Sequence, residues 1–213
     1  MKDDFNQHHR KSTRLSGYDY SAAGWYFVTI CVHDWEYLFG KIAAEQMVLN
    51  EFGQIVEQEW LRTPKIRLNV GLEEFVVMPN HFHGILVIEY SMKNDNHDDG
   101  RGVKSGGRGV KSGDRGVKSG DRGVMHYAPT ATGTTQLKSP SQTLGAIVRG
   151  FKSAVTKQIN EIRKTPGQPV WQRNFYDRII RNDRELFNIR QYIINNPMKW
   201  EMDKENPQNW EML

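Results

Sequence analysis

The sequence has a single cysteine, no long apolar run and little excess charge. One cysteine, Cys31, among 213 residues excludes an internal disulfide, and its place in the apolar stretch WYFVTICV predicts a buried thiol. No run reaches the roughly 18 apolar residues that a membrane-spanning helix needs. The N-terminal residues also lack the apolar core of a secretory signal. We therefore expect a cytoplasmic protein with no membrane partner.

The formal net charge of +4 is small and unevenly placed. Residues 101–124 read RGVKSGG RGVKSGD RGVKSGD RGV, a tandem repeat whose basic side chains outnumber its acidic ones, so the rest of the chain is slightly acidic. Units of Gly and Ser with one Val cannot build a coiled-coil seam, and the composition is that of a flexible linker. We interpret residues 91–138 as a disordered insertion in a single domain of residues 1–213. A DNA-contacting arm is the alternative.

The remaining chain alternates strand and helix patterns. Residues 24–33 predict a strand, residues 36–50 a hairpin that turns near 43–45, and the stretch after Asn50, a candidate N-cap, a helix. Two strands follow in FVVMPNHFHGILVIEY at 75–90, then a long helix within 139–163 and an extended segment at 169–181. A last helix begins after Asn182 and stops before Pro197. This order predicts an α+β, ferredoxin-like fold: an antiparallel sheet with helices on one face, plus an appended C-terminal helix.

Two histidines, His81 and His83, interrupt the apolar strand pair. Alternate residues of a strand point to the same face, so both imidazoles can be aimed at one point while Phe82 faces the core. With metal–nitrogen bonds of about 2.1 Å, such a pair can chelate one ion. The spacing favours a metal-binding or catalytic pair over two structural histidines.

The last predicted helix offers partners for this pair. Tyr192 and Asn196 are four residues apart and share one helical face. Asn196 is a candidate oxygen ligand and Tyr192 a candidate nucleophile, although the spacing fits a core tyrosine and a C-capping asparagine equally well. Tyr176 is a rival nucleophile, disfavoured because the apolar Ile180 stands four residues after it.

Three segments carry a family resemblance: VVMPNHFHGILVI, LGAIVRGFKSAVTKQIN and VWQRNFYDRIIRNDRELFNIRQYIINNP. Together they resemble the single-tyrosine HUH transposases, and among them the REP-associated tyrosine transposases. RLSGYDYSAAGWYFVTI is similar as well, so the resemblance spans about residues 10–200. Only the repeat departs from it, and the repeat touches none of the motifs. The resemblance implies that His81-Phe82-His83 is the His-hydrophobic-His motif, that Tyr192 is the nucleophile and that Asn196 completes the metal site.

The resemblance also implies a reaction. A divalent ion, Mg²⁺ or Mn²⁺, would polarise a phosphodiester of single-stranded DNA folded into a hairpin. Tyr192 would attack to give a 5′-phosphotyrosine and a free 3′-hydroxyl, and rejoining would need no ATP. Imidazole ligands alone would favour zinc. Two other hypotheses remain open: a non-catalytic nucleic-acid-binding module, and a metal-dependent phosphodiesterase that uses water.

Basic residues in the last third of the chain are candidates for contacts with DNA phosphates. They are Arg149, Lys152, Lys157, Arg173, Arg178 and Arg181. Trp171, Phe175 and Tyr176 interleave with the arginines and can stack on bases. A solvated basic face over core aromatics is the alternative for any one of them. We expect a monomer or a homodimer.

Overall fold

The computed structural model describes residues 15, 17–89 and 142–212. The insertion predicted at 91–138, and the disorder expected of it, lie outside the described residues. The organisation of residues 1–213 as one domain therefore stays a prediction. Within the described parts of the chain, no helix has both the length and the apolarity to cross a membrane.

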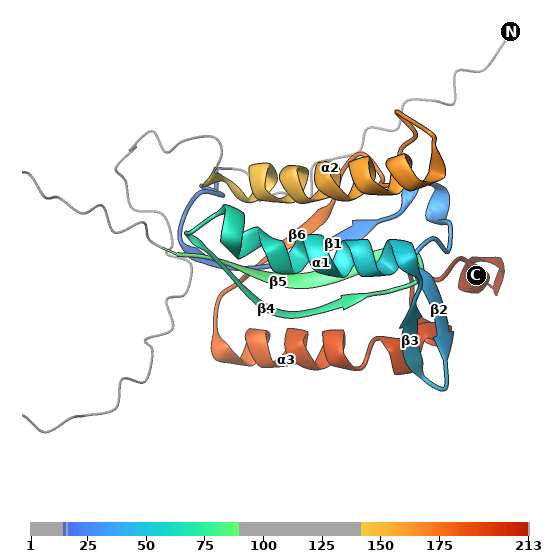
Figure 1. The fold of residues 1–213 in the computed structure, drawn as a ribbon. Helices are drawn as coiled ribbons and strands as arrows, with labels where there is room; N and C mark the ends of the chain where they lie inside the picture. The colour runs from blue at the N-terminus through green and yellow to red at the C-terminus, as the bar shows by residue number, and fades with distance from the viewer. Residues whose placement is uncertain (1–14, 16, 90–141, 213) are drawn as a thin grey trace, which may run out of the picture.

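A four-stranded antiparallel sheet forms the middle layer of the described structure (Figure 1). Its strands are β1 (Gly24–Cys31), β4 (Val70–Val77), β5 (His81–Ile88) and β6 (Tyr176–Ile180), in the spatial order β4-β5-β1-β6. The extended segment predicted at 169–181 thus supplies an edge strand. A separate hairpin of β2 (Gly40–Ala43) and β3 (Gln46–Leu49) turns at Ala44 and Glu45, which have positive φ angles. This confirms the turn expected near residues 43–45.

Two helices cover one face of the sheet and a third covers the other (Figure 1). On the first face lie α1 (Glu51–Ile66) and α2 (Leu144–Arg163), and on the second lies α3 (Asp183–Ile194). Short 3-10 turns complete the fold: η1 (His33–Trp35), η3 (Pro197–Met202) and η4 (Pro207–Met212). The expectation of helices on one face is met by α1 and α2, whereas the appended α3 packs on the opposite face.

The helix starts follow from local capping. The Asn50 side chain accepts a hydrogen bond from the Gly53 amide at 3.0 Å, and Asn182 accepts one from the Glu185 amide at 2.9 Å. Each satisfies an amide that has no partner within the helix. The N-cap expected at Asn50 and the helix start expected after Asn182 are both confirmed.

The alternation along β5 separates the core from the candidate site. Phe82 points into the core shared with α1 and α2, where its ring centroid lies 4.6 Å from that of Trp60. Ile85 packs in the cluster beneath α3. Because side chains alternate along a strand, His81 and His83 share the face of Ile85. The predicted division, with Phe82 in the core and both imidazoles on the other face, is confirmed.

Candidate active site

The two histidines of β5 lie side by side in the interior. His81 is 0% exposed and His83 is 1% exposed, and their ring centroids are 4.5 Å apart. Their cross-strand neighbours on β1 are Cys31 and Thr29, respectively. Cys31 is buried, as the sequence predicted.

Hydrogen bonds determine which nitrogen of His81 carries a proton. The Asn80 side-chain amide donates to the carbonyl of Glu205 at 2.7 Å, so its oxygen is left to accept from His81 Nδ1 at 2.8 Å. His81 Nδ1 is then the protonated nitrogen, and Nε2 presents a lone pair. Among the described residues, this buried Nε2 has no hydrogen-bond partner. An unpartnered buried lone pair is what a metal ligand presents before the ion binds.

His83 is held between β1 and α3. Its Nδ1 lies 2.8 Å from Thr29 Oγ1, and its Nε2 lies 3.1 Å from the Tyr192 hydroxyl. When Nε2 accepts the tyrosine proton or binds an ion, Nδ1–H donates to Thr29. A hydrogen bond of this kind fixes the tautomer and the ring orientation of a metal-ligating histidine.

Asn196 and Asp203 complete a polar cluster around the histidines. The Asn196 amide nitrogen donates to Asp203 Oδ2 at 3.0 Å. Since a carboxylate only accepts, the Asn196 oxygen must point elsewhere, and within the described chain this buried oxygen has no partner. Asp203 Oδ2 lies 4.0 Å from His81 Nε2. One potential ligand atom from each of His81, His83 and Asp203 falls within 4.8 Å of the others, so the group can bind a metal ion.

Burial keeps both imidazoles neutral. It lowers the pKa of His81 to about 4, although Asp203 and Asn196 favour the protonated form. Burial also lowers the pKa of His83 well below its usual value, and the neighbouring His81 adds to this effect. Neutral imidazoles offer lone pairs at physiological pH, as metal binding requires.

Tyr192 stands at the open side of this cluster. Its side chain is 40% exposed, and its ring packs edge-on against Phe27 with centroids 6.1 Å apart. Partial burial raises the pKa of the phenol, and the charge of Asp203 adds to the increase. His83 Nε2 cannot accept the Tyr192 proton and bind an ion at once, so the hydroxyl must leave that nitrogen whenever an ion takes it.

The donor set fits a divalent cation. Two imidazole nitrogens, an amide oxygen and a carboxylate oxygen are suitable ligands for Mn²⁺ or Zn²⁺, while the oxygen donors alone suit Mg²⁺. The unpartnered His81 Nε2 and Asn196 Oδ1 are the structural observation that supports this fit.

The structure brings together the four residues expected at the site, Tyr192, His81, His83 and Asn196. The rival Tyr176 begins β6, where it pairs with Thr29 and is 51% exposed. The six candidate DNA contacts are more dispersed. Arg149, Lys152, Lys157 and Arg173 line one groove, whereas Arg178 pairs with Glu185, whose other oxygen accepts from the Arg181 amide. Their contacts with DNA stay predictions.

Sequence reasoning missed Asp203, Thr29 and Asn80. Asn80 directly precedes His81, so its position beside the motif could have identified it as a residue of the site. Thr29 lies in an apolar strand whose alternation places it on the face of His83 only once the β1–β5 register is known. Asp203 follows η3 in a stretch without periodicity, so nothing local distinguishes it from a surface acid.

Comparison with known proteins gives a relative by sequence and a similar solved structure. No protein-family model matches the chain. The chain is similar to a REP-associated tyrosine transposase solved in complex with a REP hairpin: the TM-score is 0.49 and the identity 15%, over 90% of this chain and 76% of that one. An uncharacterized protein of Haemophilus influenzae is 38% identical over 199 residues, which cover 92% of this chain and 93% of that protein. At this identity, over nearly the whole of both chains, the protein belongs to the same family as the Haemophilus influenzae protein.

Proposed function

We propose that this protein is a metal-dependent transposase that cleaves and rejoins single-stranded, hairpin-forming DNA through a 5′-phosphotyrosine at Tyr192. The observation that carries the proposal is the approach of the Tyr192 hydroxyl to within 3.1 Å of His83 Nε2. That nitrogen belongs to a buried cluster in which His81 Nε2 and Asn196 Oδ1 have no hydrogen-bond partner among the described residues. Apart from the inserted β2–β3 hairpin, the order β1-α1-β4-β5-α2-β6 is compatible with the ferredoxin-like fold expected from the resemblance, which supports the same assignment.

The chain's own residues have separable roles in this reaction. The Tyr192 oxygen attacks the scissile phosphorus and loses its proton, and the bond from phosphorus to the 3′ oxygen breaks. The leaving oxygen takes up one proton to become the 3′-hydroxyl, so no net proton is released. His81, His83 and Asn196 would hold Mg²⁺ or Mn²⁺, and Asp203 would orient the Asn196 amide through their hydrogen bond. The bound ion would supply Lewis-acid stabilisation of the charge on the phosphate.

Tyr192 is partly exposed and its hydroxyl lies at the ligand cluster, which favours covalent chemistry over attack by water. A phosphodiesterase that uses water needs no tyrosine oxygen at the ligand cluster. Rejoining of the strand without ATP, in contrast, uses a covalent protein–DNA intermediate, because its phosphotyrosine ester keeps the energy of the broken ester bond. The DNA partner is taken from the resemblance of the motifs, and the basic groove described below is compatible with it.

The test is a denaturing gel of protein incubated with hairpin DNA carrying a 5′ or a 3′ label, with Mg²⁺ or Mn²⁺ in excess. We expect a slowly migrating protein adduct only on the fragment downstream of the cut, and no adduct with Tyr192→Phe. Tyr176→Phe is the matched control and should keep the adduct.

Two results would contradict the proposal. An undiminished adduct in Tyr192→Phe would place the nucleophile on another residue. Cleavage by the wild type without any adduct would make water the attacking group, and the protein would then be a metal-dependent phosphodiesterase.

A further inference from the structure

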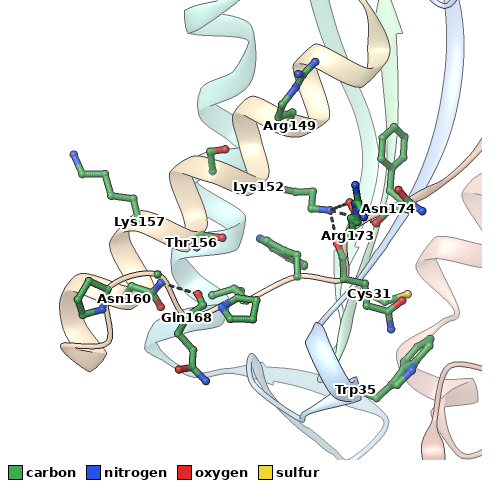
Figure 2. A pocket seen from close by; sticks show the side chains of 18 of the residues that line it. Cys31, Trp35, Arg149, Lys152, Thr156, Lys157, Asn160, Gln168, Arg173 and Asn174 are labelled. Atoms are coloured by element: carbon green, nitrogen blue, oxygen red, sulfur yellow. Dashed lines mark hydrogen bonds between the residues drawn. The ribbon is translucent and has the colours of Figure 1, made fainter. Parts of the chain in front are cut away.

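A groove of about 1520 Å³ lies between α2 and the segment of residues 164–176 that leads into β6 (Figure 2). Lys152 reaches across it from α2 and donates to the backbone carbonyls of Gln172, Arg173 and Asn174 at 2.6, 3.3 and 3.2 Å. Lys152 therefore ties the segment to the helix, and its ammonium already has three acceptors. These hydrogen bonds fix the segment against the helix that directly precedes it in the chain.

The groove concentrates positive charge. Of the described residues that line it, one is acidic, Glu161, and five are cationic: Arg149, Lys152, Lys157, Lys164 and Arg173. Its net charge equals the +4 of the entire chain. Glu161 pairs with Lys157 at 3.9 Å, but both side chains are well exposed, so the pair offsets little of the attraction for an anion. A polyanion is the ligand that this charge would attract.

One end of the groove adjoins the candidate active site. Cys31 and Tyr176 both line it. Cys31 is the cross-strand partner of His81, and Tyr176 is that of Thr29, whose hydroxyl contacts His83. Since β6 is an edge strand, no further strand of the described sheet stands between the groove and the face that carries the histidines.

Tyr176 indicates that the polyanion is single-stranded. This residue lines the groove, is 51% exposed and pairs across the sheet with Thr29, the neighbour of His83. An exposed aromatic ring beside a basic groove binds single strands by stacking on unpaired bases, and a base inside a duplex cannot offer that face.

We propose that this groove binds the single-stranded part of the DNA substrate that adjoins the scissile phosphate. Arg149, Lys157 and Arg173 contact its phosphates, and Tyr176 stacks on a base close to the site. The assignment rests on the proposed function for its substrate, but DNA binding can be measured without cleavage.

The experiment measures fluorescence anisotropy of a labelled oligothymidylate of about 12 nucleotides in EDTA, between about 50 and 200 mM salt. The groove variant is the double substitution Arg149→Gln and Lys157→Gln. Its matched control on α1 is Arg62→Gln and Lys65→Gln, which also removes one arginine, one lysine and one ion pair. Glu59, the partner of Arg62 at 3.3 Å, is buried but keeps its hydrogen bond from Gln158. Losing two phosphate contacts should reduce the slope of log affinity against log salt by about 1.4 for the groove variant only.

Tyr176 is tested separately. Tyr176→Ala should weaken binding about tenfold through the lost stacking, whereas Tyr176→Phe, which keeps the ring, should bind as the wild type does. If Tyr176→Ala binds normally, the stacking assignment is wrong.

Three further outcomes test the groove, the single-strand assignment and the proposed function. Equal affinities and salt slopes for the groove variant and its control would overturn the groove as a DNA site. A blunt duplex that binds as tightly as the single strand, and loses as much in the groove variant, would overturn the single-strand assignment. A wild type that binds through the groove but never forms the covalent adduct would refute the proposed function and leave the groove assignment standing.

Discussion

Acidification should destabilise the metal-free protein through its buried histidine pair. Burial lowers the pKa of His81 to about 4 and that of His83 well below its usual value, whereas an unfolded histidine titrates near 6.5. Between these values the unfolded chain binds protons that the folded chain excludes. The stability that the folded protein has with both histidines neutral is therefore fully present above about pH 6.5 and is lost as the pH falls toward 4.

The linkage relation gives the size of the effect. His81 has a pKa of about 6.5 in the unfolded chain and about 4 in the folded protein. This difference alone lowers the free energy of unfolding by about 2 kcal/mol from pH 7 to pH 5, and by about 3 kcal/mol from pH 7 to pH 4. His83 adds to the loss. Glu205 opposes it, because burial raises the pKa of its carboxyl and so favours the folded state as the pH falls. For a chain of this size, 2 kcal/mol corresponds to a decrease in Tm of about 4–8 °C.

The assay compares wild type and His81→Gln by urea and thermal denaturation in EDTA at pH 7, 6 and 5. The difference between the two proteins isolates the contribution of His81 from that of the carboxylates. His33→Gln is the matched control, since it removes an imidazole from a side chain that is 45% exposed, and it should follow the wild type. Saturating Mn²⁺ should move the loss of stability to lower pH, because an ion competes with protons for the same lone pairs.

A single result would refute this reasoning. If wild type and His81→Gln lose stability in parallel from pH 7 to pH 5, then protonation of His81 does not oppose folding. The imidazole would then be either solvated or already charged in the folded state, and the buried cluster would not be a site of neutral ligands.

Three further predictions concern strands β1 and β5 and the residue Asn196. Gly84→Ala should destabilise the fold by about 1–3 kcal/mol, because its Cβ would lie 2.7 Å from Trp60 Cζ2; an unchanged urea midpoint would contradict this. Thr29→Val should weaken Mn²⁺ binding about 10–100-fold in calorimetry, since it removes the group that orients His83, and Thr29→Ser should restore it; equal affinities for all three proteins would exclude that role. Asn196→Ala should reduce DNA cleavage and regain part of it at high Mn²⁺, and no regain would remove Asn196 from the ligand set.

The features predicted correctly from the sequence depend on contacts between near neighbours in the chain. The caps at Asn50 and Asn182 involve amides three residues away, and the hairpin turn at Ala44 and Glu45 closes within its own segment. The alternation of His81 and Phe82 is a property of any extended strand. Such patterns are legible in the sequence because the backbone geometry of a single element determines them.

The tertiary structure decided what local patterns leave open. It placed α3 on the face opposite α1 and α2 and made residues 176–180 an edge strand beside β1. It brought Asp203 to Asn196, the Thr29 hydroxyl to His83, and the Lys152 ammonium to three backbone carbonyls. The contact of Thr29 joins strands far apart in the chain, and the contacts of Lys152 span 20–22 residues. Asp203 approaches Asn196 through the non-periodic turn that follows α3. Hydrogen bonds of this kind leave no repeating signal, because they depend on strand register and on which face a helix covers rather than on spacing along the sequence.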